Sequence, residues 1–98
     1  MPDVGALAAA YGVRVELADL GDWAAVTLVA EYDPDGPVIR VNERAMPPGD
    51  VIGRAIDHAV AHELYHHREA VGEIVRIADP AQRERAADAF ADALVRAS

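Results

Sequence analysis

The sequence predicts an α+β domain with an N-terminal helix, a small three-stranded sheet that contains a hairpin, and two C-terminal helices. Three observations predict it. Apolar and polar residues alternate near the N-terminus, a strong turn separates two β-branched runs, and apolar residues recur every four positions in the second half. The chain has 98 residues, so we expect one domain spanning 1–98.

The first elements are short. Residues 4–11 are mostly apolar and compatible with a helix, and Gly12 is placed to end it. Residues 13–17 alternate apolar and polar side chains, which indicates a half-buried strand.

A hairpin is predicted next. Residues 25–32 and 38–41 are rich in apolar and β-branched side chains, as strands are. Between them stand Asp33, Pro34, Asp35 and Gly36, and this segment has strong turn chemistry because proline presets φ and glycine tolerates positive φ. The second and third strands should therefore pair with each other.

Two amphipathic helices are predicted in the second half. Asp50 can cap the first, and Gly72 suits the position just past its end. Its apolar stripe has four members: Ile52, Ile56, Val60 and Leu64. Asp79 can cap the last helix, with Pro80 as its first residue. The predicted buried face of this last helix comprises Ala87, Phe90, Ala91, Leu94 and Val95.

Composition excludes several classes of function. The net charge is −8, without the basic surface that nucleic-acid binding needs. No apolar run approaches the roughly 20 residues that span a bilayer, and the N-terminus lacks the positive region of a secretory signal. The chain has no cysteine, so any metal must be held by histidine and carboxylate. We expect a cytoplasmic protein that binds neither nucleic acid nor membrane.

A possible metal site lies on the first of these two helices. His62 and His66 are four residues apart, so both imidazoles lie on one helix face and can bind one Zn²⁺ at about 2.0–2.1 Å. Glu63 follows directly, where its carboxylate can take a proton from zinc-bound water, whose pKa the metal lowers to about 7. Together they form the His-Glu-x-x-His pattern of zinc peptidases.

A catalytic zinc site needs a third protein ligand and one open position. Glu84 is the best candidate because it lies on the last predicted helix, beside its apolar stripe. Asp88, one turn later, could accept a hydrogen bond from the distal N–H of a ligand histidine. Glu73 and Asp79 are weaker candidates because both precede the helix and would be held less rigidly.

The simplest alternative is a pair of surface histidines on a solvated helix face. It is disfavoured because all four histidines fall between positions 58 and 67, beside the apolar stripe. His58 is interpreted as a residue of the rim or core edge rather than an extra ligand, and His67 is expected to be exposed. Tyr65 is interpreted as core filling.

Two motifs resemble those of the ImmA/IrrE zinc metallopeptidases and of the very small gluzincins called minigluzincins. They are His62-Glu63-Leu64-Tyr65-His66 and Glu84-Arg85-Ala86-Ala87-Asp88-Ala89-Phe90-Ala91. The resemblance implies three zinc ligands, His62, His66 and Glu84. It also implies that Glu63 is the general base and that Asp88 supports a ligand from outside the coordination sphere. Members of this family include proteases that cleave repressors.

The sequence therefore predicts a zinc-dependent metalloendopeptidase that acts on a peptide or protein, and the resemblance implies a regulatory protein such as a repressor. An extended substrate could add to an exposed sheet edge, which we expect to be the third strand. One alternative is a catalytically silent or latent protein-binding module that zinc stabilises. Another is a metal-free interaction domain in which the histidines are incidental.

Overall fold

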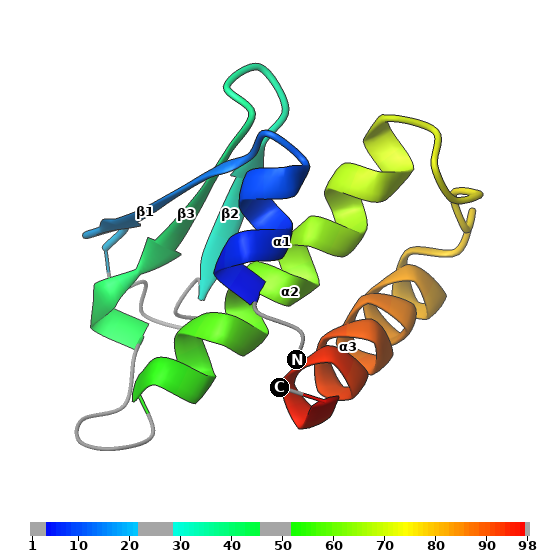
Figure 1. Ribbon diagram of the computed structural model, residues 1–98. Helices are drawn as coiled ribbons and strands as arrows, with labels where there is room; N and C mark the ends of the chain where they lie inside the picture. Colours follow the sequence, from blue (N-terminus) through cyan, green and yellow to red (C-terminus); the bar gives the residue numbers. More distant parts are fainter. Residues whose placement is uncertain (1–3, 22–28, 46–51, 98) are drawn as a thin grey trace.

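The computed structural model describes residues 4–21, 29–45 and 52–97 of the chain (Figure 1). The elements, in chain order, are α1 (Val4–Ala10), β1 (Arg14–Ala18), β2 (Ala30–Asp33), β3 (Val38–Asn42), the 3-10 helix η1 (Glu43–Ala45), α2 (Ile52–Ala70) and α3 (Pro80–Ala97). In this part of the chain there are three α-helices and a small mixed sheet, so the predicted α+β class is confirmed.

The sheet has the strand order β1-β3-β2. β2 pairs antiparallel with β3, with Tyr32 opposite Ile39, which confirms the predicted hairpin. β1 pairs parallel with the other side of β3, with Val15 opposite Ile39. The expectation that the third strand offers an exposed edge is therefore wrong. Local patterns show which strands form a hairpin, but they do not show on which side the first strand joins.

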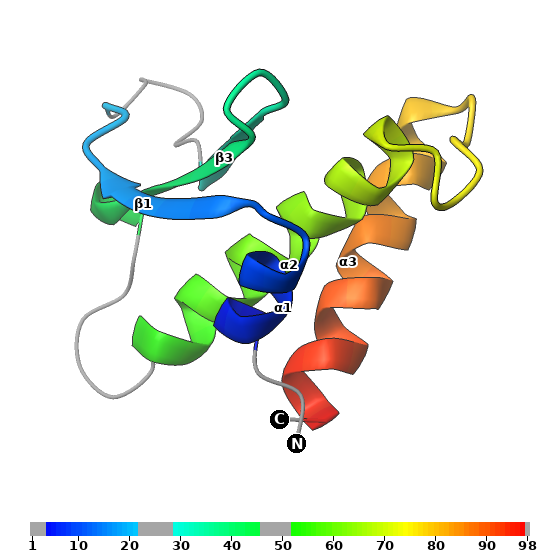
Figure 2. The same ribbon diagram turned by 45° about the horizontal axis from the view of Figure 1, so that its top comes forward.

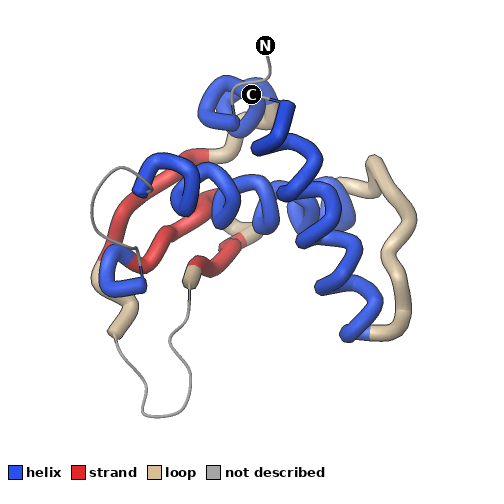
Figure 3. Tube along the Cα trace, turned by 90° about the horizontal axis from the view of Figure 1, so that it is seen from below, coloured by secondary structure: helices blue, strands red, loops and turns tan. Residues whose placement is uncertain are grey.

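The helices lie in layers on one face of the sheet. Figures 1 and 2 show α1 and α2 on the same face, with α3 beside α2, and Figure 3 gives the view from below. α2 packs against β2, β3, α1 and α3, so it is the central helix of the fold. Different sides of α2 therefore face the sheet, α1 and α3, and side chains such as Arg54 remain exposed.

The core sits between β3 and α2. Ile39 and Val41 of β3 are fully buried, and they share one hydrophobic cluster with Val60 and Leu64 of α2, two members of the predicted stripe. Many of the other buried side chains are alanines: Ala8, Ala30, Ala59, Ala61, Ala87 and Ala91. Small side chains let helices approach closely but each contributes little buried apolar area, so the core is thin.

The predicted ends of the helices are confirmed where the structure describes them. Gly12 has a φ of 72° just after α1, and Gly72 has a φ of 78° just after α2, the left-handed conformation that ends helices. The Ala81 N–H donates to Asp79 Oδ1 at 3.2 Å, so Asp79 caps α3, and Pro80 is its first residue. The predicted cap Asp50 and the strand residues 25–28 lie outside the described residues.

β1 is more exposed than its alternating pattern predicts. Val15 and Leu17 are 40% and 58% exposed, although both lie opposite fully buried residues of β3. The reason is tertiary, because the long helix α2 packs against β2 and β3, whereas the short helix α1 packs against β1. The long helix therefore covers the middle of the sheet and leaves much of this edge exposed.

The limits of the core can be tested with a matched pair of substitutions. We expect Ile39→Ala to lower the free energy of unfolding by about 2–5 kcal/mol, because Ile39 is fully buried. Leu17→Ala, at a side chain 58% exposed, should cost about 1 kcal/mol or less. Urea denaturation measures both, and equal losses would contradict this assignment of the core.

Candidate metal centre

The two paired histidines of α2 point away from the core. Val60 and Leu64 are buried, and each histidine follows one of them by two positions, which is about 200° around the helix axis. The rings of His62 and His66 meet edge to face, with centroids 5.2 Å apart. The fold of α2 onto the sheet therefore presents both imidazoles to the same side.

Glu84 of α3 lies against both histidines. Its Oε2 is 2.8 Å from His62 Nε2, and its Oε1 is 3.3 Å from His66 Nε2. One ligand atom from each of these three residues lies within 4.8 Å of the others, so the group could hold a metal ion. The structure thus brings together the three residues that the sequence marked as candidate ligands.

The hydrogen bonds of the two rings indicate where their lone pairs point. His62 Nδ1 is 2.7 Å from Asp88 Oδ1, and His66 Nδ1 is 2.9 Å from Glu69 Oε1. When each Nδ1–H donates to its carboxylate, each Nε2 is left with a lone pair. In that tautomer both lone pairs and the Glu84 carboxylate converge, an arrangement that a bound cation would stabilise. Two imidazoles and a carboxylate form a donor set that suits Zn²⁺.

Glu69 is a site residue that the sequence analysis missed. Its side chain is only 3% exposed, and besides His66 it faces Arg83, whose Nε lies 3.3 Å from Glu69 Oε2. A buried carboxylate in this place orients the His66 ring, whose other nitrogen, Nε2, faces Glu84. The signal was present in the sequence, because Glu69 follows His66 by three positions and shares its helix face.

This role of Glu69 makes a testable prediction. We expect Glu69→Ala to weaken zinc affinity by about 10–100-fold, since the imidazole loses the acceptor that orients it. Glu69→Gln keeps an acceptor oxygen of the same shape and should lose less. Competition with a chromophoric chelator measures both affinities. Unchanged affinity in Glu69→Ala would show that the contact with His66 has no effect on the metal.

Glu63 lies beside the three candidate ligands. Burial raises the pKa of its carboxyl above the usual value, and the nearby imidazoles of His62 and His66 partly oppose this rise. A carboxyl group whose pKa is raised can accept a proton and release it again nearer neutral pH. Glu63 and the candidate ligands face the same cleft.

That cleft has a volume of about 670 Å³ and opens between the hairpin and the two long helices. β2 contributes Ala30 and Tyr32, α2 contributes His58 and Glu63, and α3 contributes Arg83. The candidate metal centre is therefore open to a ligand of peptide size along one side.

His58 lies at the rim of the cleft, as the sequence analysis proposed. Its side chain is 38% exposed, and its Nε2 lies 2.8 Å from Asp92 Oδ1 of α3. It does not join His62, His66 and Glu84 in the metal-binding group found among the described residues.

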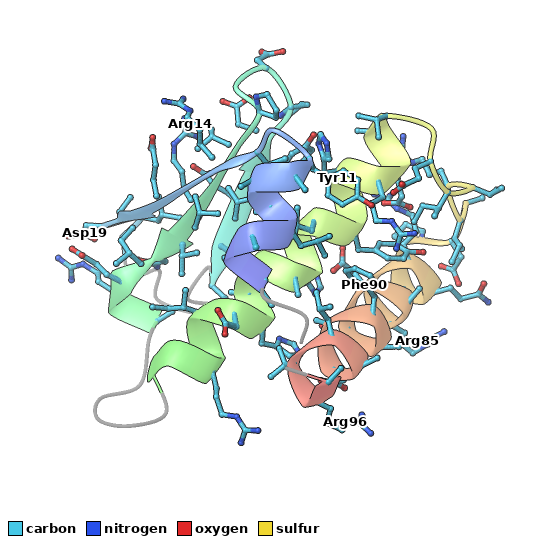
Figure 4. All side chains as sticks on the ribbon, in the orientation of Figure 1. Tyr11, Arg14, Asp19, Arg85, Phe90 and Arg96 are labelled. Carbon is cyan, nitrogen blue, oxygen red and sulfur yellow. The ribbon has the colours of Figure 1, made fainter. Side chains whose placement is uncertain are left out.

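The expectation that His67 is exposed is wrong. It is only 5% exposed, its Nδ1 lies 2.7 Å from the hydroxyl of Tyr32, and its ring meets those of Tyr11 and Tyr32 edge to face. Figure 4 shows Tyr11 reaching from the end of α1 towards α2. The physical reason is helical spacing, since His67 follows the buried Val60 by seven positions and continues its stripe. Burial lowers the pKa of His67, which favours its neutral form.

The remaining candidates have other partners. Glu73 accepts hydrogen bonds from the Tyr11 hydroxyl and the Arg68 guanidinium, and Asp79 caps α3. Tyr65 is 9% exposed and its ring lies 6.1 Å from that of Phe90, so its interpretation as core filling is confirmed.

Comparison with models of known protein families, with curated proteins and with solved structures found no match. A search of the described helices for a membrane span found none of sufficient length and apolar character. The site must therefore be interpreted from its own geometry.

Proposed function

We propose that this protein is a zinc-dependent metallopeptidase. The observation that carries the proposal is the convergence of His62, His66 and Glu84 in an open cleft, with the Glu63 carboxyl beside them. Two imidazoles, one carboxylate and an adjacent second carboxylate are the groups that hydrolysis at a zinc site requires. The resemblance of residues 62–66 and 84–91 to the ImmA/IrrE motifs points to the same activity.

In this proposal His62 and His66, through their Nε2 atoms, and Glu84, through its carboxylate, would hold the zinc ion. Asp88 and Glu69 hold the two imidazoles by their Nδ1–H groups. When bound, zinc would supply a Lewis acid that polarises the peptide carbonyl and makes a water molecule more acidic.

Glu63 moves the proton. Its carboxylate takes a proton from the water that attacks the peptide carbonyl and passes it to the nitrogen of the leaving amine as the C–N bond breaks. The burial that raises its pKa suits this double role, because a more strongly acidic carboxyl would hold the proton too weakly.

The peptide would bind along β2 rather than along the third strand. β2 is an edge strand of the described sheet, and its Ala30 and Tyr32 line the cleft. An extended peptide that pairs with this free edge would gain main-chain hydrogen bonds and pass beside the metal centre. The resemblance further suggests a regulatory protein such as a repressor as the substrate.

Metal content and hydrolysis test the proposal together. Protein purified without chelator and supplied with zinc should hold one zinc ion per chain by elemental analysis. It should cleave a library of quenched fluorescent peptides, and 1,10-phenanthroline should abolish this cleavage. A protein that binds no zinc would refute the proposal. One bound zinc without any cleavage would instead support the alternative of a zinc-stabilised binding module.

A further inference from the structure

A second, smaller cavity adjoins the cleft. Its volume is about 330 Å³, and it shares three lining residues with the cleft: Tyr32, His66 and Arg83. Beyond these it is lined by Glu69, Ala70 and Arg76. A chain that lies in the cleft can therefore extend a side chain, or its own end, past His66 into this cavity.

The charges around the second cavity do not balance. Oε1 of the buried Glu69 carboxylate lies 2.9 Å from His66 Nδ1, and Oε2 forms an ion pair with Arg83 Nε at 3.3 Å. Arg83 is thus compensated by Glu69. Arg76 is exposed at the cavity wall, and within the described part of the chain no ion pair joins it to an acidic side chain. One positive charge is left at this end of the site.

This local charge contrasts with its surroundings. The chain as a whole has a net charge of −8, and the adjoining cleft carries Glu63, Glu84 and Asp88. An acidic peptide would be repelled from most of this surface, so a cationic cavity is the place where a carboxylate is best accommodated. Arginine is also the side chain best suited to hold a carboxylate through two parallel hydrogen bonds.

We propose that the second cavity is a subsite for a carboxylate of the bound peptide and that Arg76 is its specificity-determining residue. The proposal rests on the proposed peptidase function, since it assigns the substrate class of the same site. The carboxylate is that of an aspartate or glutamate side chain, or that of the peptide's C-terminus. Glu69 and Arg83 both line this subsite, and Arg83 lines the cleft as well.

Peptide binding to the Glu63→Gln variant tests this without relying on cleavage. The probes are fluorescent, N-acetylated and C-amidated hexapeptides with one glutamate at each position in turn, and matched peptides with glutamine. Fluorescence anisotropy, with and without zinc, gives the dissociation constants. At one position glutamate should bind about fivefold more tightly than glutamine, as expected for a carboxylate–guanidinium pair that is partly exposed.

Two further variants locate the effect. Arg76→Gln, made in the same background, should abolish the preference for glutamate. Arg85→Gln removes the same charge from α3 at an exposed position outside both cavities and should retain the preference (Figure 4). Circular dichroism checks that each variant is folded.

A glutamine peptide with a free C-terminus distinguishes a side-chain carboxylate from the C-terminal carboxylate. Only a subsite for the C-terminal carboxylate would bind this peptide more tightly than its C-terminal amide.

The outcomes separate this inference from the proposed activity. If the wild-type protein never cleaves peptides but shows a glutamate preference that requires Arg76, the peptidase proposal fails and the subsite stands. If peptides are cleaved but neither glutamate nor a free C-terminus tightens binding, or if Arg76→Gln keeps whichever of these two preferences is found, the subsite proposal is overturned. Absence of binding by any of the peptides would overturn it as well.

Discussion

We expect Glu63→Gln to reduce kcat/KM for peptide hydrolysis by about 10²–10⁴-fold, the usual contribution of a positioned general base. Glutamine has the shape of glutamate but cannot take a proton from water near neutral pH. Because Glu63 lies beside the candidate ligands rather than among them, the variant should retain its zinc. Progress curves with a quenched fluorescent peptide, together with elemental analysis of the same samples, measure both properties.

A matched control is available in Glu43. It carries the same charge, is exposed in η1 and lies outside the cleft, so Glu43→Gln should leave hydrolysis unchanged. Loss of activity together with loss of zinc in Glu63→Gln would point to a structural role. Full activity in a zinc-loaded Glu63→Gln sample would exclude Glu63 as the base.

Zinc should stabilise the fold strongly. A metal that binds only the folded state at about 1,000 times its dissociation constant adds about 4 kcal/mol to the free energy of unfolding. For a chain of this length such a gain corresponds to a rise in melting temperature of roughly 15–30 °C. The effect is large relative to the stability that a thin, alanine-rich core can provide, and thermal denaturation with zinc or with chelator measures it.

Substitutions on α3 test whether this stabilisation comes from the candidate centre. Glu84→Ala removes the carboxylate that faces both histidines and should abolish most of the zinc-dependent rise. Asp92→Asn changes a carboxylate two turns later on the same helix. Of the four histidines, Asp92 contacts only His58 at the rim, so this variant should keep the zinc-dependent rise in melting temperature. If both variants respond to zinc as the wild-type protein does, the metal binds elsewhere.

Local sequence patterns were sufficient for most of the secondary structure. The turn chemistry of residues 33–36 predicts the hairpin, and positive-φ glycines at 12 and 72 mark the ends of two helices. The pairing of His62 with His66 is equally local, because helical spacing alone puts them on one face. The proximity of Glu84 to the two histidines could be anticipated only because α3 carries an apolar stripe beside Glu84, and this stripe has to pack against another element.

Other features depend on which surfaces meet, and no local pattern carries that information. β3 lies in the middle of the sheet because β1 joins its outer side in parallel, and β1 is left exposed because α2 covers β2 and β3 instead. Helical spacing puts His67 on the stripe of Val60, but the two rings that meet it, Tyr11 and Tyr32, come from other elements.

The same division holds at the site. The chain's own pattern specifies two histidines, an adjacent glutamate and a helix that bears carboxylates, since these follow from residue identity and helical period. The contact of Glu69 with Arg83, and the position of Arg76 at a second cavity, arise only when α3 and the loop before it pack against α2. Whether two charged side chains on different elements form an ion pair depends on the distance between them, and only the packing of those elements sets that distance.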